Sequence, residues 1–380
     1  MLVLPSWYPT ARYPAGGIFC QEQALALNVI GGVDVVVLFV DRTPVDEWLR
    51  APFRRAQLMV EAGLRVYRTR IPRLPGVWPL LYIVSAALSG RRLMRRYGFR
   101  PDVVHAHVAL PAGLAGALIK RLFAIPLVVT EHTGPFSLLM RDRSAAFMTR
   151  TALQYADRVV AVSRALRDQI WAYPQLKRHI DIISNVVNTA EFAAPRAARL
   201  DVPYRLLFVG EMDTPIKGTD YMLGALSLLK QRGVDCRLKL VGRGRNKREY
   251  EALARQLGVA DLCEFVGVVP HTEMARLMHE SDVYVMSSLA ETFGVVLVEA
   301  MAAGVPVVAT RCGGPEEIVT EDVGLLVEPA NSAALAEAIA DVLARPDRFP
   351  SIHLHEVAEA RYGQHSVASK LVTLYRQVMR

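Results

Sequence analysis

The chain has 380 residues and a formal net charge of +8; 52% of its residues are apolar and 22% are charged. This composition excludes a disordered or low-complexity protein and is sufficient for two or three folded domains. The four cysteines are scattered, without a Cys-x-x-Cys pair, which argues against a disulfide framework or a zinc site and favours a reducing compartment. No signal peptide and no apolar stretch of about 20 residues are evident, so we expect a cytoplasmic protein.

Apolar runs alternate with helix-like segments through the first half of the chain. The strands predicted here are Val33–Val40, Val103–Ala109, Pro126–Thr130 and Arg158–Val162, and the helices include Phe19–Val29 and Ala112–Leu122. A further strand is expected almost at Met1. Continuous apolar strands are typical of a parallel sheet that is covered by helices on both faces. Residues 1–190 are therefore expected to form a doubly wound, Rossmann-like α/β domain.

The alternation weakens at Phe192–Pro203, where we expect the linker, and then restarts as a second domain over residues 204–360. Its predicted strands are Tyr204–Val209, Arg237–Val241, Glu264–Val266, Val283–Ser287 and Pro306–Thr310, and its predicted helices include Thr219–Arg232, Glu249–Leu257 and Thr272–Glu280. The last helical segment, residues 366–380, can belong to either domain, and packing back on the first is one of the two options.

Two glycine-containing turns follow predicted strands, where open α/β sheets bind their ligands. Gly16 and Gly17 stand just before a helix, so backbone N–H groups there can hold an anion. The alternative, a glycine loop without a ligand, is equally compatible with the sequence. The Gly242-Arg243-Gly244 turn lacks the third glycine of a dinucleotide-binding motif and shows only that a nucleotide can approach closely.

Histidines stand at the ends of two predicted strands. His105 and His107 share one face of a regular strand and can be a metal pair, but no further ligands with suitable spacing accompany them. We therefore expect no metal and interpret His105 as a packed, hydrogen-bonded side chain. Glu131 and His132 follow the next strand, where either side chain can face a cleft or belong to an ordinary polar loop.

The strongest signal surrounds Glu291 and Glu299. Glu291 precedes the predicted helix Val295–Ala303, which contains Glu299 and ends at Gly304. The free N–H groups of the helix start can hold an oxygen or a phosphate. The two carboxylates can accept hydrogen bonds from sugar hydroxyls and a ribose diol, or act as an acid and base pair.

These residues resemble the retaining glycosyltransferases of the GT-B fold, family 4 (group 1). The similarity runs through nearly the whole chain and is strongest over residues 291–309, which read ETFGVVLVEAMAAGVPVVA. Further matches are Gly313-Gly314, Gly324-Leu325-Leu326-Val327, the His105-Ala106-His107 strand end and Ser184-Asn185. The resemblance implies two Rossmann-like domains that face each other across a cleft, with the acceptor on the first and the donor on the second.

The resemblance also implies roles for individual residues. Gly16, Gly17 and Lys217 would hold the donor diphosphate, and Glu299 would bind the ribose. Glu291 and the amides of Phe293, Gly294 and Val295 would bind the transferred sugar, with His107 near the reacting carbon and the segment from Phe265 to Gly267 beside the base. The family retains anomeric configuration and needs no metal or other cofactor beyond the nucleotide-sugar co-substrate. Since no protein nucleophile is obvious, front-side attack assisted by the donor phosphate is the favoured route.

Two positions depart from the family pattern. Glu211 stands where Arg often follows the glycine at Gly210, and Ser287 replaces the usual Pro. Because a carboxylate repels phosphate, Glu211 puts the diphosphate site in doubt, and Arg243 or Arg245 is a candidate to compensate for it. His132 completes the set of further candidate site residues.

The expected reaction is transfer of a hexose-type sugar to a lipid-linked or cell-envelope glycan. The main alternative is a nucleotide-sugar 2-epimerase of similar architecture. The positive charge alone suggests nucleic acid, but no supporting motif accompanies it, so we expect no nucleic-acid partner. The segment Leu80–Arg96, with arginines at 91, 92, 95 and 96, is a candidate for peripheral contact with an anionic membrane; a buried helix with a basic end is the alternative.

Overall fold

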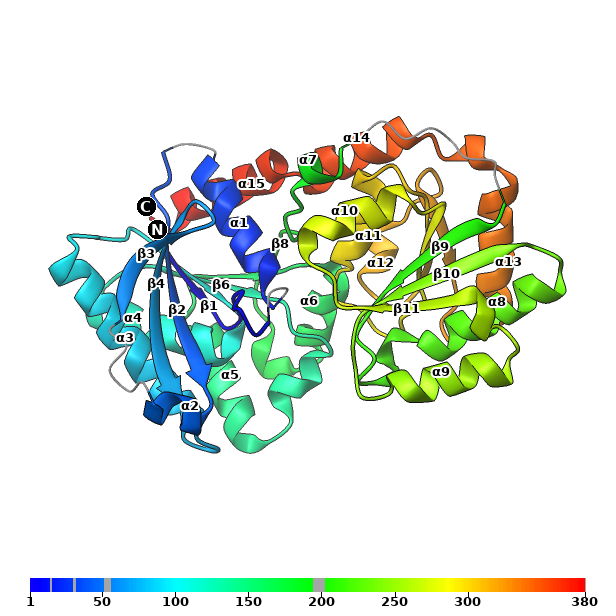
Figure 1. The fold of residues 1–380 in the computed structure, drawn as a ribbon. Helices are drawn as coiled ribbons and strands as arrows, with labels where there is room; N and C mark the ends of the chain where they lie inside the picture. Colours follow the sequence, from blue (N-terminus) through cyan, green and yellow to red (C-terminus); the bar gives the residue numbers. More distant parts are fainter. Residues whose placement is uncertain (14–15, 30–31, 51–55, 194–201, 380) are drawn as a thin grey trace. The chain divides into compact units, whose positions relative to one another are not determined.

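The computed structural model describes residues 1–13, 16–29, 32–50, 56–193 and 202–379 (Figure 1). The chain forms two compact units, one of Met1–Val186 with Gln364–Arg380 and one of Val187–Gly363. The division falls after Val186, a few residues before the expected linker, of which residues 194–201 lie outside the described part. The helix α15 (Gln364–Val378) belongs to the first unit.

The described residues of the first unit contain an eight-stranded sheet with the order β3-β4-β2-β1-β5-β6-β7-β8. Neighbouring strands are parallel, as predicted, except that β3 runs antiparallel to β4. The strands are β1 (Leu2–Pro5), β2 (Val36–Thr43), β3 (Gln57–Glu61), β4 (Leu64–Pro72), β5 (Val104–His107), β6 (Leu127–Glu131), β7 (Arg158–Ala161) and β8 (Asp181–Ile182). The β3–β4 hairpin was not predicted, because its charged side chains interrupt the apolar pattern of a buried strand.

Helices cover both faces of this sheet (Figure 1). They are α1 (Ile18–Val29), α2 (Val45–Arg50), α3 (Trp78–Arg96), α4 (Leu114–Phe123), α5 (Arg143–Tyr155), α6 (Arg164–Trp171) and α15, with short helical turns at η1 (Ala109–Gly113), η2 (Phe136–Met140) and η3 (Pro174–Leu176). Serine and aspartate begin two of them: Ser163 accepts from Leu166 N, and Asp142 accepts from Ala145 N.

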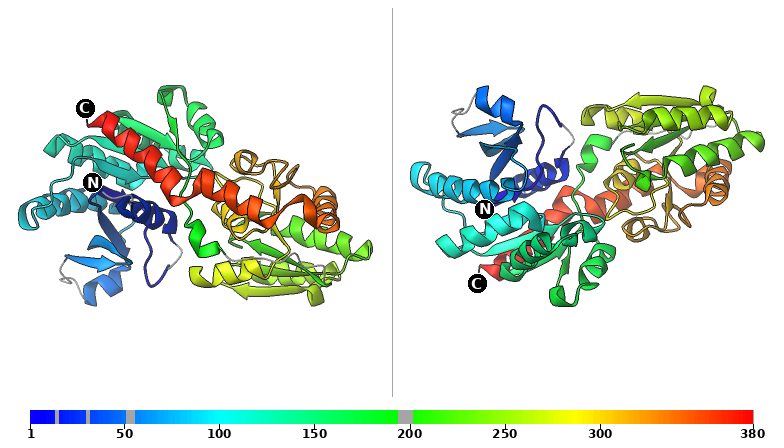
Figure 2. Two further views of the ribbon diagram at one scale, coloured as in Figure 1. Left: turned by 90° about the horizontal axis from the view of Figure 1, so that it is seen from above. Right: turned by 90° about the horizontal axis from the view of Figure 1, so that it is seen from below.

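The helix α15 lies beside α1 and completes the core of the first unit (Figure 2). Its side chains Leu371 and Leu374 are buried in one cluster with Ala24 and Leu27 of α1. Tyr375 is also buried there, and its hydroxyl lies 2.7 Å from Nδ1 of His105 at the end of β5. The sequence does not show to which domain this helix belongs. In the structure its apolar face packs on the first sheet, so the helix belongs to the first unit.

In the second unit the described residues form a six-stranded parallel sheet with the order β11-β10-β9-β12-β13-β14. The strands are β9 (Tyr204–Val209), β10 (Cys236–Val241), β11 (Cys263–Gly267), β12 (Val283–Met286), β13 (Val307–Thr310) and β14 (Gly324–Val327). The first five lie where the sequence predicts strands, to within one or two residues at each end. The prediction of two parallel-sheet α/β domains is therefore confirmed.

The helices of the second unit are α7 (Thr189–Phe192), α8 (Thr219–Gln231), α9 (Lys247–Gln256), α10 (His271–His279), α11 (Val295–Ala302), α12 (Pro315–Ile318), α13 (Ser332–Ala344) and α14 (Ser351–Tyr362), with short turns η4 (Pro215–Lys217), η5 (Ala260–Leu262) and η6 (Pro346–Arg348). The α11 helix is apolar on nearly all sides and is buried from Leu297 to Ala302. It packs against β12 and β13, which flank it in the sequence.

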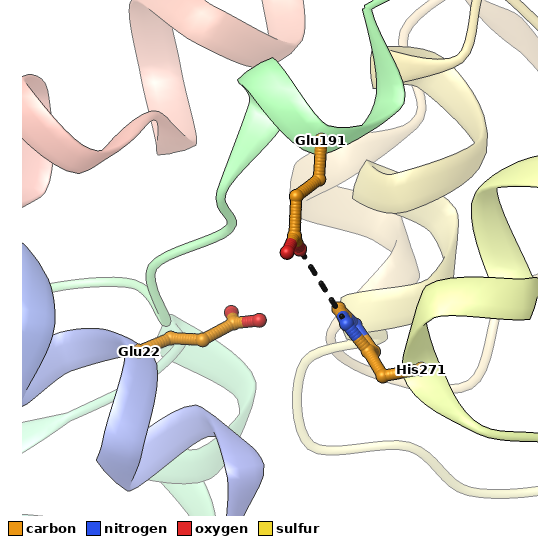
Figure 3. A group of neighbouring side chains, drawn as sticks. All are labelled: Glu22, Glu191 and His271. Carbon is orange, nitrogen blue, oxygen red and sulfur yellow. Dashed lines mark ion pairs between the residues drawn. The ribbon is translucent and has the colours of Figure 1, made fainter. Parts of the chain in front are cut away.

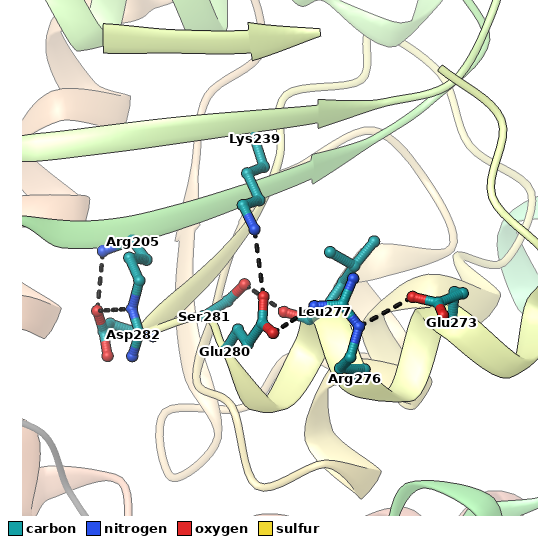
Figure 4. Close-up of polar contacts among 8 residues, drawn as sticks. All are labelled: Arg205, Lys239, Glu273, Arg276, Leu277, Glu280, Ser281 and Asp282. Atoms are coloured by element: carbon teal, nitrogen blue, oxygen red, sulfur yellow. Dashed lines mark hydrogen bonds and ion pairs between the residues drawn. The ribbon is translucent and has the colours of Figure 1, made fainter. Parts of the chain in front are cut away.

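Charged side chains anchor the C-terminal end of α10 to the sheet (Figure 4). Glu280 accepts from Lys239 of β10 at 3.2 Å and from Arg276 of α10. Two residues later, Asp282 accepts from the backbone N–H of Arg205 in β9 at 2.8 Å. These bonds tie the end of α10 and the residues after it to β10 and β9.

Candidate active site

In the second unit, Lys217 and Glu291 form an ion pair, although 74 positions separate them in the sequence. The Lys217 ammonium lies 2.7 Å from Oε2 of Glu291, and the two side chains are 29% and 16% exposed. Lys217 ends the turn η4 after β9, and Glu291 follows β12, the neighbouring strand. Parallel pairing of β9 and β12 thus brings the carboxyl ends of both strands, and with them these two charges, to the same edge of the sheet.

The turn that carries Lys217 is held by Ser287, the residue that replaces the usual Pro of the family. The Ser287 hydroxyl donates to the Gly218 carbonyl at 2.8 Å and contacts the Lys217 carbonyl at 3.2 Å. Gly218 has a φ of +64°, and a side chain at this position would overlap the carbonyl oxygen of Ser287. The departure from the family pattern therefore adds side-chain hydrogen bonds that position Lys217.

Glu291 is fixed by its backbone. Its N–H donates to the Cys312 carbonyl at 3.0 Å, and its carbonyl accepts from Gly314 N at 2.8 Å. Its remaining carboxylate oxygen, Oε1, accepts from Thr292 N at 3.1 Å. The Gly313-Gly314 turn that the sequence singled out is therefore the support of Glu291.

Backbone amides at the start of α11 lie unpaired. Gly294, with a φ of +99°, precedes the helix, and within the described residues the N–H groups of Phe293, Gly294 and Val295 have no hydrogen-bond acceptor. Unpaired N–H groups at a helix start attract anions and ligand oxygens. The Phe293 side chain is buried and packs edge-on against Tyr362, so only its backbone is offered to a ligand.

One turn into α11, Glu299 is buried at 5% exposure and is hydrogen-bonded by a histidine that the sequence analysis missed. Nε2 of His271 lies 3.3 Å from Oε1 of Glu299, and its Nδ1 lies 3.5 Å from Glu191 of α7 (Figure 3). His271 thus links two carboxylates. It begins α10 directly after Pro270, and this position at a helix start was the available sequence signal.

The other donor-side candidates surround this cluster less closely. Phe265 is half-buried, with Lys247 stacked over its ring at 5.9 Å, and the Gly267 carbonyl accepts from Gly242 N. Arg243 is exposed, and its carbonyl accepts from Met212 N at 2.8 Å. The glycine turn at 242–244 is thus packed against the loop after β9. Glu211 in that loop is exposed and makes no hydrogen bond or ion pair with any described residue.

In the first unit, His105, His107 and His132 form a buried row. The rings of His105 and His107 lie 4.5 Å apart, on one face of β5 as predicted, and Nδ1 of His107 lies 3.0 Å from Nε2 of His132. Both nitrogens of His105 are occupied, by Tyr375 and by Thr130 Oγ1 at 2.7 Å. His105 is therefore a hydrogen-bonded structural side chain, whereas Nε2 of His107 has no partner among the described residues and is left for a ligand.

Burial keeps these histidines neutral. It lowers the pKa of His107 to about 3, and it lowers the pKa values of His105 and His132 well below the usual range, with a further contribution from the neighbouring rings. His107 can therefore offer a hydrogen bond at neutral pH but cannot act as an imidazolium acid.

Glu131 has a structural task that the sequence did not indicate. Its fully buried carboxylate accepts from three backbone N–H groups, those of Ala109, His132 and Thr133, at 2.7–2.9 Å. Next to Ala109, Val108 has a φ of +76°, which is rare for a β-branched residue. Glu131 thus holds the strained chain that follows His107.

Gly16 and Gly17 differ in their surroundings. Gly16 lines a pocket of the first unit, whereas Gly17 is buried with a φ of +74°, and a side chain there would overlap the backbone of Trp7. The close approach of two chain segments therefore explains Gly17.

Lys217 and Glu291 in the second unit and the histidine row in the first unit lie at the carboxyl ends of parallel strands. Family models match both parts of the chain. The model of glycosyltransferase family 4 matches residues 30–191, and that of glycosyl transferases group 1 matches residues 203–345. An uncharacterized glycosyltransferase of Methanocaldococcus jannaschii is 30% identical over 72% of this chain and 74% of its own. A Bacillus subtilis protein named as a glycosyltransferase of teichuronic acid biosynthesis is 27% identical over 100% of this chain and 98% of its own.

Solved structures show the same fold. A sucrose-phosphate synthase of Thermosynechococcus elongatus has a TM-score of 0.78 and 22% identity, covering 99% of this chain and 98% of its own. The Anabaena protein HepE, solved with UDP-glucose, has a TM-score of 0.73 and 18% identity, covering 99% of both chains. The epimerase alternative receives no support from the family models or from these proteins. The chain belongs to the group 1, family 4 glycosyltransferases and has their GT-B fold.

Proposed function

We propose that this glycosyltransferase transfers a hexose-type sugar from a nucleotide-diphosphate sugar, with retention of configuration and without a metal ion. The observation that carries the proposal is the Lys217–Glu291 pair beside the unpaired amides of residues 293–295. An ammonium suits a diphosphate, amides suit phosphate or sugar oxygens, and carboxylates suit hydroxyls. Glu299, one oxygen of which is engaged by His271, retains its second oxygen for a ribose hydroxyl.

The donor class is supported by the structural neighbour that was solved with UDP-glucose. We therefore use UDP-glucose as the first donor to test. In the expected step, the bond between the anomeric carbon and the phosphate oxygen breaks, and the acceptor oxygen bonds to that carbon on the same face. The acceptor proton passes to an oxygen of the departing diphosphate. The neutral state of His107 agrees with a hydrogen-bonding role toward the sugar.

The proposed acceptor is a lipid-linked or cell-envelope glycan. The name of the Bacillus subtilis relative supports this class. Within the described residues no helix is long and apolar enough to cross a membrane. The α3 helix nevertheless presents an exposed row at helical spacing, the α3 stripe, made of Val77, Leu80, Val84, Leu88, Arg91 and Arg95. We propose that this stripe makes peripheral contact with an anionic membrane, because apolar side chains followed by arginines suit its interface.

The test is incubation of the purified protein with UDP-glucose, with and without a mixture of membrane-extracted glycan acceptors, followed by NMR of the products. Acceptor-dependent release of UDP and an α-linked product, both unaffected by a chelator, are expected. A β-linked product would refute retention, and activity that a chelator abolishes and a divalent ion restores would refute metal independence. Conversion of the nucleotide sugar to its epimer without an acceptor would refute transfer.

A further inference from the structure

A pocket of the first unit lies at the carboxyl ends of β1, β2 and β4. It has a cavity volume of about 480 Å³, within the range of small-molecule sites. The register pairs Leu2 of β1 with Val36 of β2, so Pro5 at the end of β1 lies opposite Phe39. The last residues of β2, Val40–Thr43, therefore project beyond the end of β1. Four residues at about 3.3 Å each give an overhang of about 13 Å, which forms one wall of the pocket.

Arginines and aromatic side chains line this pocket. The arginines are Arg12, Arg42, Arg70 and Arg73, and the aromatic residues are Trp7, Tyr8, Tyr13 and Phe39. Asp41 and Glu47 are the acidic residues in the lining, so four positive and two negative charges leave a balance of +2. Such a surplus of positive charge attracts anionic ligands to the pocket.

Arg42 is the most constrained of these cations. Its guanidinium is stacked over Trp78, the first residue of α3, at 4.4 Å. Burial and the neighbouring charge of Arg73 lower the pKa of Arg42. Within the described residues neither Arg42, Arg70 nor Arg73 forms an ion pair, although the nearby Asp41 carboxylate attracts Arg70 and Arg42 electrostatically. The Thr43 hydroxyl beside them also has no hydrogen-bond partner among the described residues.

Exposed aromatic side chains of the lining suit a sugar ring. Trp7 and Tyr13 are 38% and 47% exposed, which is unusual for large aromatic side chains, and aromatic faces pack well against the apolar face of a pyranose. Ser6 also lines the pocket, and its N–H donates to the His107 carbonyl at 3.2 Å. The pocket therefore begins one strand away from the residue expected near the reacting carbon.

We propose that this pocket binds the acceptor and that the acceptor is an acidic saccharide, whose carboxylate or phosphate lies against Arg42, Arg70 and Arg73 while its ring packs on Trp7 or Tyr13. The proposal rests on the proposed function, which supplies the need for an acceptor, and adds its chemical class. A planar guanidinium binds a carboxylate or a phosphate through two parallel hydrogen bonds, so the two sources of the acidic group share one recognition chemistry.

The experiment titrates the full-length protein calorimetrically with D-glucuronate, glucose 6-phosphate, glucose and inorganic phosphate, all at one ionic strength. The double variant Arg42→Gln/Arg73→Gln is compared with Arg100→Gln/Arg121→Gln, which removes the same charge from exposed sites of the same unit. We expect glucuronate or glucose 6-phosphate to bind the wild type and glucose not to bind measurably. The pocket variant should lose at least about tenfold in affinity for the acidic sugar, and the control less than about twofold.

The two acidic probes separate a carboxylate acceptor from a phosphate acceptor. Any of three results would overturn the proposal. Glucose binds as tightly as the acidic sugars, inorganic phosphate binds as tightly as glucose 6-phosphate, or both double variants lose affinity equally. If the pocket variant does not fold, Arg73→Gln alone, at an exposed position after β4, provides the same comparison.

A titration with UDP keeps the two proposals distinguishable. Loss of UDP affinity in the pocket variant, to the same extent as loss of the acidic sugar, would assign the pocket to the donor and overturn the acceptor proposal. If the wild type binds acidic sugars but neither UDP nor UDP-glucose, the proposed donor fails while the pocket stands. If UDP binds and no acidic sugar does, the pocket proposal fails and the proposed function remains.

Discussion

Replacing Lys217 by Met tests whether the Lys217–Glu291 pair binds the diphosphate of the donor. The substitution keeps the length of the side chain but removes the ammonium 2.7 Å from Glu291. A hydrogen bond to a charged group contributes about 1.5–3 kcal/mol, so the lost contact with the diphosphate alone should weaken binding about ten- to hundredfold. The Glu291 carboxylate, only 16% exposed, is then left without its cation and repels the anionic donor. We therefore expect a loss near the upper end of that range.

Calorimetric titration with UDP of wild type, Lys217→Met, Glu291→Gln and the double variant measures both contributions. The double variant should recover about tenfold relative to Lys217→Met, since it lacks the repelling carboxylate. Lys230→Met, at an exposed lysine of the same unit, is the matched control and should bind UDP like the wild type. Wild-type affinity in Lys217→Met, or no recovery in the double variant, would refute the assignment of Lys217 to the diphosphate.

Four further outcomes are expected. Glu299→Ala should reduce UDP affinity about ten- to hundredfold while leaving the unfolding transition in place, and an unchanged affinity would remove Glu299 from the site. Glu211→Arg should tighten UDP binding in a salt-sensitive manner, since Glu211 is exposed and makes no hydrogen bond or ion pair with described residues; weaker binding of UDP-glucose alone would instead indicate that Glu211 contacts the sugar. Because the folded-state pKa of His107 is lowered to about 3, the unfolded chain binds a proton below about pH 6.5 that the folded chain does not. Stability should then fall as the pH is lowered from about 6.5 to about 3, with His107 contributing about 1.4 kcal/mol per pH unit, and urea unfolding of His107→Asn should show a smaller slope. Replacing both arginines of the α3 stripe with Gln should reduce sedimentation with vesicles of anionic phospholipid but not UDP binding, and unchanged sedimentation would contradict membrane contact through this stripe.

The sequence predicts most strands of both sheets but not the β3–β4 hairpin, β8 or β14. Strands such as Tyr204–Val209 are continuous apolar runs, and the structure reproduces that one residue for residue. The edge strand β3 is only half covered, so its pattern is mixed, and tertiary pairing with β4 rather than local propensity makes it a strand. Likewise, the helix at the end of the chain shows an apolar face, but its partner surface is formed by residues hundreds of positions away.

The parts of the candidate active site that lie in short sequence motifs could be predicted. Glu291, the free amides before Val295 and the pairing of His105 with His107 all follow from short-range patterns. The contacts of His271 and Glu131 could not be predicted, because strand order and helix packing determine their partners. The arginines of the pocket were not predicted as site residues, since β2 and β4 bring them together from separate segments and single arginines form no motif.

The second unit is, topologically, an insertion into the first, because α15 returns to the sheet that the chain begins. During synthesis, residues 1–186 emerge long before Leu371, Leu374 and Tyr375, yet these side chains fill the core beside α1. Until they arrive, His105 lacks the hydroxyl that binds its Nδ1. The core of the first unit is therefore completed only after the inserted unit has been translated, so the second unit is free to fold first and the histidine row is completed last.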